Sequence, residues 1–186
     1  MKYEKIINKL WEIYTIQNPS VQKIYDLFVS HGEEVVNDHI AFRTFENSRI
    51  DIDVLSKVFR ENGYIEKGQY KFEKKKLFAK HFEHREDENA PRIFISQLLI
   101  SEFSEYLQDV VKQSIDKIPE ELFGSGKLIY SGNLWGPPSF EIYNKLKVES
   151  EYAAWLYVYG FCANHFTVSI NHLSNFRKIE EVNTLL

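Results

Sequence analysis

The segment from residue 37 to residue 45, NDHIAFRTF, alternates strictly between two sets of side chains. Successive side chains of an extended chain point to opposite sides, so His39, Ala41, Arg43 and Phe45 fall on one face of a strand. The other face is mainly apolar. The segment therefore predicts a strand that buries one face and presents a histidine and an arginine on the other.

The pattern of apolar residues changes after this strand. Between residues 51 and 62 they recur at helical spacing, and Gly63 follows as a helix-ending residue. Strand-like segments then follow at about 64–72, 76–84 and 92–100. The order strand, helix, strand, strand, strand predicts a βαβββ module, and the fold class is therefore α+β.

The start of the first strand is repeated near the end of the sequence. Residues 163–172, ANHFTVSINH, alternate in the same phase, and His165 takes the place that His39 has in the first segment. A helical pattern follows over residues 173–186, so the chain begins the module a second time. We expect this second module to be incomplete in this sequence, since three more strands would be needed to finish it.

We expect a single domain over residues 1–186. Its parts are a helical hairpin over 1–32, the first βαβββ module over 33–100, a helical connector over 101–160 and the start of the second module over 161–186.

Composition argues against several classes of protein. The formal charge is −4, and the 23 Lys and Arg residues are scattered among 27 Asp and Glu residues, which argues against a nucleic-acid partner. No segment approaches the roughly 20 apolar residues of a membrane span, and no signal peptide is expected. A single cysteine, Cys162, excludes an internal disulfide and favours a reducing cytoplasm.

The repeated histidines are the candidate metal ligands. If the two modules pair with pseudo-symmetry, their first strands lie side by side, and His39 and His165 could reach one ion. Imidazole binds iron, zinc, copper and nickel, and two histidines with one carboxylate are the ligand set of non-haem Fe(II) oxygenases. The open positions of such an ion would take a bidentate acid and dioxygen.

Other polar residues are candidates for binding the substrate. Arg43 shares the face of His39, four residues or about 13 Å further along the strand, and could clamp a substrate carboxylate. His81 and Gln97, on the third and fourth strands of the module, could line the same pocket. We interpret the run Lys74-Lys75-Lys76, which acidic residues soon follow, as a solvated turn.

Three segments together resemble a known family. NDHIAFRTF, the strand Pro91 to Leu98 (PRIFISQL) and ANHFTVSINHL are similar to the 2-oxoadipate dioxygenase/decarboxylase family, whose fold resembles paired vicinal-oxygen-chelate modules. The resemblance extends from about residue 5 to the end of the sequence.

The resemblance implies a function and a set of site residues. His39 and His165 match the family's iron-binding histidines, and Arg43 matches the arginine that contacts the substrate carboxylate. It implies Fe(II), dioxygen and 2-oxoadipate, a lysine catabolite that is converted to 2-hydroxyglutarate with loss of carbon dioxide. The family's iron-binding glutamate belongs to the last strand of the second module and has no match in this sequence.

Two alternatives differ in kind from this function. The chain could be a truncated or non-catalytic relative, a metal-free binding module whose open sheet edge pairs with another copy. It could also keep a metal, Fe(II) or another divalent ion, and catalyse isomerisation or ring cleavage, because this fold supports several chemistries.

Overall fold

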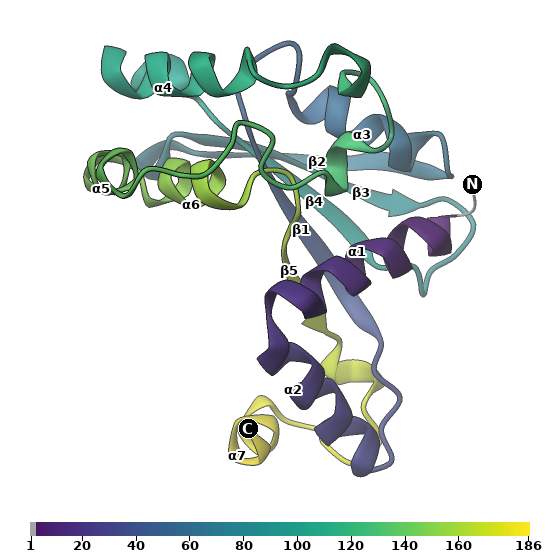
Figure 1. Cartoon of the computed structure of the whole chain (residues 1–186). Helices are drawn as coiled ribbons and strands as arrows, with labels where there is room; N and C mark the ends of the chain where they lie inside the picture. Colours follow the sequence, from purple (N-terminus) through teal and green to yellow (C-terminus); the bar gives the residue numbers. More distant parts are fainter. Residues whose placement is uncertain (1–2) are drawn as a thin grey trace.

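The computed structural model describes residues 3–186, and a five-stranded mixed sheet of order β2-β3-β4-β1-β5 runs through it (Figure 1). The strands are β1 (Asn37–Phe45), β2 (Tyr64–Phe72), β3 (Leu77–His84), β4 (Arg92–Leu98) and β5 (Ala163–Val168). The α-helices are α1 (Tyr3–Gln17), α2 (Pro19–Ser30), α3 (Ile52–Arg60), α4 (Glu105–Ile115), α5 (Phe140–Glu149), α6 (Glu151–Tyr159) and α7 (Ile179–Leu185).

The βαβββ module is confirmed. Strands β1 and β2 have the predicted bounds, and β3, β4 and α3 lie within the predicted segments. Strand β1 pairs in parallel with β4 and antiparallel with β5. The two histidine-bearing strands are therefore neighbours, as the repeat predicts.

The C-terminal elements are shorter than predicted. We expected a strand over residues 163–172, but β5 ends at Val168, because Ile170–His172 forms a 3-10 turn. The helix expected over residues 173–186 begins only at Ile179. Alternation of side chains thus continues past the point where the backbone leaves the sheet.

One face of the sheet packs against α3 and forms the core. Ile40, Phe42 and Thr44 on β1 are at most 1% exposed, and Phe42 lies 5.6 Å from Phe59 of α3, centroid to centroid. Asp51 caps this helix, since its side chain accepts from Val54 N–H at 2.9 Å. Burial of a ring such as Phe59 contributes about 1.5–3 kcal/mol to stability. Because α3 covers this face of β1, only the opposite face is open to a ligand.

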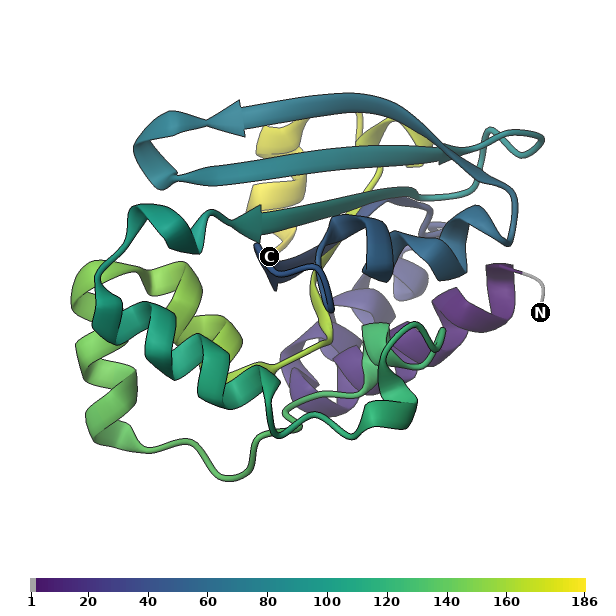
Figure 2. The ribbon, with the colours of Figure 1, turned by 90° about the horizontal axis from the view of Figure 1, so that it is seen from above.

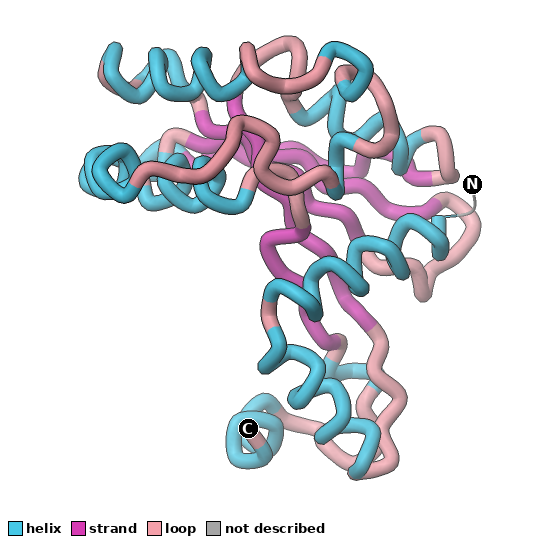
Figure 3. Tube along the Cα trace, in the orientation of Figure 1, coloured by secondary structure: helices cyan, strands magenta, loops and turns pink. Residues whose placement is uncertain are grey.

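The remaining helices form two groups. Helices α1, α2 and α7 gather around the lower ends of β1 and β5, whereas α4, α5 and α6 lie at the opposite end (Figures 1 and 2). The Phe166 ring of β5 packs against Trp11 and Tyr14 of α1, both at 5.1 Å between centroids. The strands pass between these two groups of helices (Figure 3). Strand β5 is thus held in place by its packing against α1 as well as by its backbone pairing with β1.

The connector of residues 101–160 is helical, as predicted, and returns the chain to β5. Gly160, at φ 66°, ends α6, and Gly132 and Phe161 form an antiparallel bridge beside it. Cys162 follows and is buried, which raises the pKa of its thiol to about 11. Within residues 3–186 no helix combines the length and the apolar character that crossing a membrane requires.

Candidate functional site

His39 and His165 meet on the open face of the sheet. His165 is in register with Ala41 across the antiparallel pair of β1 and β5. The two Nε2 atoms lie 3.3 Å apart, and the rings are nearly perpendicular at 77°. The structure therefore brings together the two histidines that the sequence repeat singles out.

The residue before each histidine fixes the orientation of its ring. Asp38 Oδ2 lies 2.8 Å from Nδ1 of His39, and Asn164 Oδ1 lies 2.9 Å from Nδ1 of His165. Thr167 Oγ1 is also 3.0 Å from Nδ1 of His39. Because a carboxylate or amide oxygen accepts, each Nδ1 carries the proton and each Nε2 presents a lone pair.

The geometry of the two Nε2 atoms fits a shared cation. Two nitrogen ligands at about 2.1 Å from one ion lie about 3.0–3.4 Å apart when the angle at the ion is about 90–110°, and the observed distance is 3.3 Å. Burial, His39 and Arg43 lower the pKa of His165, which favours the neutral form that binds metal.

The protein donors found here make up only part of a metal site. Within the described residues no group of three or more His, Cys, Asp and Glu side chains is placed to hold an ion. His39 and His165 are thus two donors of the type that iron and zinc accept, and no third His, Cys, Asp or Glu side chain among residues 3–186 is placed to join them.

Arg43 lies between two aromatic rings of α6. Its guanidinium carbon is 4.8 Å from the ring centroids of both Tyr152 and Trp155. Burial lowers its pKa, and none of the groups that act on this pKa is a carboxylate. A half-buried cation held by ring faces and free of an acidic partner within residues 3–186 is suited to binding an anion.

Tyr152 lies beside Arg43, and no sequence motif assigns it a specific role. Its hydroxyl accepts from Thr44 N–H at 3.0 Å and donates to the Ser96 carbonyl at 2.6 Å, so it inserts between the parallel strands β1 and β4. Burial raises its pKa. The tyrosine thereby ties α6 to the sheet next to Arg43. The aromatic composition of α6 hinted at packing, but no local motif indicates this contact.

His81 lies on the same face of the sheet as the histidine pair, but it is not among the residues that line the pocket there. Its ring stacks on Phe94 at 5.1 Å, and Phe94 lies 5.2 Å from His39. Its Nδ1 is 2.9 Å from the Tyr70 hydroxyl. His81 therefore packs in the aromatic group beside the site. It contacts Phe94 and Tyr70, and these two residues line the pocket.

Gln97 does not reach this site. It is paired with Thr44 in the β1–β4 register, on the face that packs against α3. Its side-chain oxygen accepts from Ile52 N–H at 3.3 Å, at the start of that helix. The expectation that Gln97 lines the pocket is therefore wrong. Side chains alternate along β4, so Gln97 points to the opposite face from Phe94 and Ser96, which line the pocket.

A pocket of about 410 Å³ lies over the histidine face. Its lining is His39, Ala41, Phe42, Tyr70, Phe72, Lys75, Leu77, Ala79, Phe94, Ile95, Ser96 and His165. It is mainly apolar, with the two histidines on one wall, which is typical of a small-molecule site.

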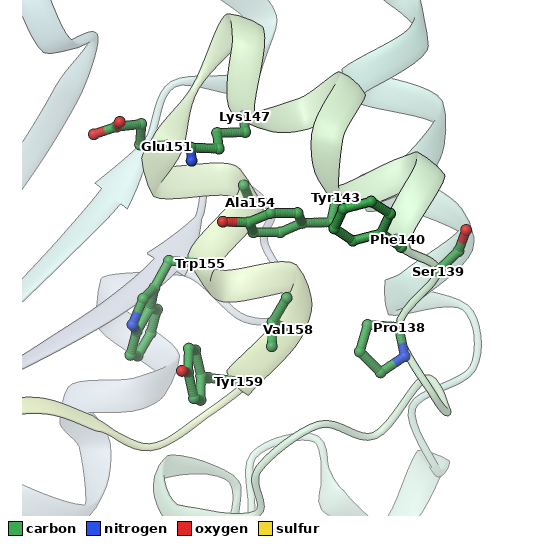
Figure 4. A pocket seen from close by; sticks show the side chains of 10 residues that line it. All are labelled: Pro138, Ser139, Phe140, Tyr143, Lys147, Glu151, Ala154, Trp155, Val158 and Tyr159. Carbon is green, nitrogen blue, oxygen red and sulfur yellow. The ribbon is translucent and has the colours of Figure 1, made fainter. Parts of the chain in front are cut away.

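A larger pocket, of about 520 Å³, opens between α5 and α6 (Figure 4). Phe140 and Tyr143 line one wall, and Trp155 and Tyr159 the other. None of its lining residues is a histidine or cysteine, so it offers no donor comparable with the histidine pair. It adjoins the candidate site at Trp155, the residue that also contacts Arg43.

Comparison with solved structures identifies the class of fold. A protein from Ralstonia eutropha, assigned only provisionally to the glyoxalase superfamily, aligns with a TM-score of 0.72 at 21% identity, over 86% of this chain and 59% of that one. A protein from Shewanella frigidimarina, named only provisionally as a hydrolase, aligns with a TM-score of 0.91 at 45% identity, over 97% of this chain and 70% of that one. The fold is thus of the glyoxalase type.

The chain belongs to the 2-oxoadipate dioxygenase/decarboxylase family, whose model matches residues 3–126. The rice plastid enzyme of that name is 33% identical over 97% of this chain, and the Arabidopsis thaliana enzyme is 32% identical over 99%. The rice hydroxyglutarate synthase, solved in complex with 2-oxoadipate, aligns with a TM-score of 0.90 over 98% of this chain and 62% of that one. This chain spans 53% of the length of both plant enzymes.

Proposed function

We propose that this chain carries the two-histidine part of a non-haem Fe(II) dioxygenase/decarboxylase that acts on a 2-oxo acid. The observation that carries the proposal is the 3.3 Å distance between the Nε2 atoms of His39 and His165, in a chain of this family. The substrate that the family name indicates is 2-oxoadipate.

Each residue has a distinct task in this proposal. His39 and His165 hold the ion through Nε2, while Asp38 and Asn164 keep their Nδ1 atoms protonated. Arg43 binds a carboxylate of the substrate, because it is a half-buried cation oriented by aromatic rings. The apolar wall around Phe94 excludes water from the space above the ion.

A bound Fe(II) ion supplies open coordination positions for a 2-oxo acid and dioxygen, and with them the redox chemistry of oxidative decarboxylation. The balanced reaction takes 2-oxoadipate and one dioxygen to 2-hydroxyglutarate and one carbon dioxide. A third ligand, a carboxylate, would have to come from outside residues 3–186.

The proposal also covers where the protein works. A role in lysine catabolism follows from the family substrate. A reducing cytoplasm suits the single buried thiol of Cys162.

Strand β5 is at the edge of the sheet, and pairing of two copies through this edge is part of the same proposal.

Anaerobic titration with Fe(II), followed by oxygen consumption with 2-oxoadipate, tests the function. We expect the wild-type chain to bind one ion, and His39→Ala and His165→Ala each to abolish binding. His31→Ala, at an exposed histidine, is the matched control. Iron binding without turnover would support the metal site but refute the proposed enzymatic activity of this chain. No iron binding at all would favour the metal-free interaction module.

A further inference from the structure

Helix α5 carries apolar residues on two faces. Leu146 is buried, and Ile142 packs with it on the face that points to the core. Phe140, Tyr143 and Lys147 lie three and four residues apart, so they form a second stripe along the helix. This stripe lines one wall of the pocket of about 520 Å³ between α5 and α6 (Figure 4). An apolar stripe on the outer side of a helix is typical of an interaction surface.

The stripe begins with a ring that projects into solvent. Phe140 is 77% exposed and stacks on Tyr143 at 6.3 Å between ring centroids. On the other wall, the rings of Trp155 and Tyr159 of α6 lie 5.0 Å apart. The surface therefore offers a projecting ring beside a hollow lined by rings. A small molecule in the hollow would leave most of Phe140 in water, whereas a protein surface can cover both.

Two charges of opposite sign lie at one end of this pocket. Lys147 on α5 and Glu151 on α6 both line it, at the end away from Phe140 (Figure 4). Both are exposed, and neither forms a salt bridge within residues 3–186. One cation on one wall and one anion on the other make the surface complementary to an identical surface.

We propose that a second copy of this chain binds to the surface that α5 and α6 form. The residues of this α5–α6 surface are Phe140, Tyr143, Lys147, Glu151, Trp155 and Tyr159. A two-fold axis that runs along the groove places α5 of each copy over α6 of the other. Lys147 then meets Glu151 of the other copy, and Phe140 meets the rings of Trp155 and Tyr159. One symmetry operation thus pairs both charges and covers the exposed ring. The contact is separate from the β5 edge and does not depend on the proposed activity.

The contact covers a side chain that also borders the candidate site. The ring centroid of Trp155 lies 4.8 Å from the guanidinium carbon of Arg43. A Trp155 ring packed against Phe140 of a second copy has fewer conformations available. The dimer therefore holds Arg43 more firmly than the monomer does.

Sedimentation velocity of charge variants tests the proposal. Lys147→Glu leaves two anions on the surface, and Glu151→Lys leaves two cations. Each variant alone should dimerise at least about tenfold more weakly than the wild type, because like charges face each other. Mixed in equal amounts, the two variants should associate again, since each cation then faces an anion. Lys23→Glu is the control, because it makes the same change in net charge at an exposed position of α2.

A second pair of variants tests the apolar part of the contact. Phe140→Ala should weaken dimerisation at least about tenfold, because aromatic anchors contribute most of the binding energy at interfaces. Ile16→Ala removes an equally exposed apolar side chain, 72% exposed on α1, and should dimerise like the wild type. Equal effects of the two substitutions would show that Phe140 is not an anchor.

Other outcomes would overturn the proposal. A wild type that stays monomeric at about 100 μM would refute the contact. A dimer that persists unchanged in both Lys147→Glu and Glu151→Lys would place the contact on another surface, such as the β5 edge. If the two variants are folded by circular dichroism but do not associate when mixed, Lys147 and Glu151 do not face each other.

Discussion

The Nε2 atoms of His39 and His165 face each other at 3.3 Å across two antiparallel strands. With both Nδ1 protons engaged by Asp38 and Asn164, two nitrogen lone pairs point at the same small volume. Lone pairs this close repel unless a proton or a metal ion lies between them. The strand pairing thus creates an affinity for positive charge before any third ligand is added.

Removal of the Asp38 side chain should weaken metal binding without unfolding the chain. Asp38 accepts from Nδ1 of His39 and also pairs with Arg92 at 3.2 Å. Loss of such a partner typically lowers metal affinity about 10- to 100-fold. Competitive titration of Zn(II) with a chelating dye measures this for Asp38→Ala. Asp109→Ala, at an exposed acid of α4, should bind Zn(II) like the wild type.

The Tyr152 hydroxyl should be important for stability. In Tyr152→Phe the buried Thr44 N–H loses its acceptor, which costs about 1–3 kcal/mol in free energy of unfolding. Urea denaturation followed by fluorescence gives this value. Tyr159→Phe on the same helix should change stability by less than about 0.5 kcal/mol, because Tyr159 is exposed. Equal stabilities of the two variants would contradict the bridging role.

Gly160 should not tolerate a side chain. A Cβ at this position would lie 2.1 Å from the Gly132 carbonyl oxygen, and the backbone has φ 66°. We expect Gly160→Ala to lower the free energy of unfolding by about 2–4 kcal/mol. Gly32→Ala has a similar φ of 76° but no atom within 4 Å of the new Cβ, so it should cost only about 1 kcal/mol. Thermal unfolding of both variants separates the cost of the steric clash at Gly160 from the cost of backbone strain, which both positions share.

Glu33 should make the segment after β5 sensitive to acid. Burial acts to raise its pKa, but hydrogen bonds from the Ser174 and Asn175 amides, at 2.7 and 2.6 Å, outweigh burial, and the pKa of Glu33 is lowered. The stabilisation is thus present at neutral pH and is lost as the pH falls through the lowered pKa.

Amide hydrogen exchange at Ser174 and Asn175 measures this release. We expect protection in the wild type to fall with acidification, and Glu33→Gln to show weak protection at every pH. Glu34→Gln, at the exposed neighbour, should keep the wild-type profile. A wild-type profile in Glu33→Gln would show that the carboxylate does not hold the segment.

Local patterns were sufficient for the strands of the first module. The alternation of NDHIAFRTF gave the bounds of β1, because one face must be buried against α3. The same rule failed for residues 169–172, where alternation continues but the backbone turns into a 3-10 helix at Ile170–His172. Side-chain periodicity records which faces are apolar, and only backbone pairing determines where a strand ends.

The candidate site was predictable only where a repeat marked it. His39 and His165 have equivalent places in two strands, so their proximity followed from pairing of the strands. The environments of Tyr152 and Lys75 depend on how α6 and the β2–β3 turn pack, which no short motif encodes. Gln97 was misplaced because the faces of neighbouring strands must be related through their register, which the sequence does not state.

Strand β5 has consequences for the order in which the molecule is made. It lies at the edge of the sheet, with β1 as its neighbour, and carries one of the two paired imidazoles. During synthesis the first module, with His39, leaves the ribosome long before residues 163–168. Until those residues arrive, the nascent chain offers a single imidazole at this position. The histidine pair forms only after the connector is synthesised, so both imidazoles would be available to the proposed ion only when most of the chain can fold.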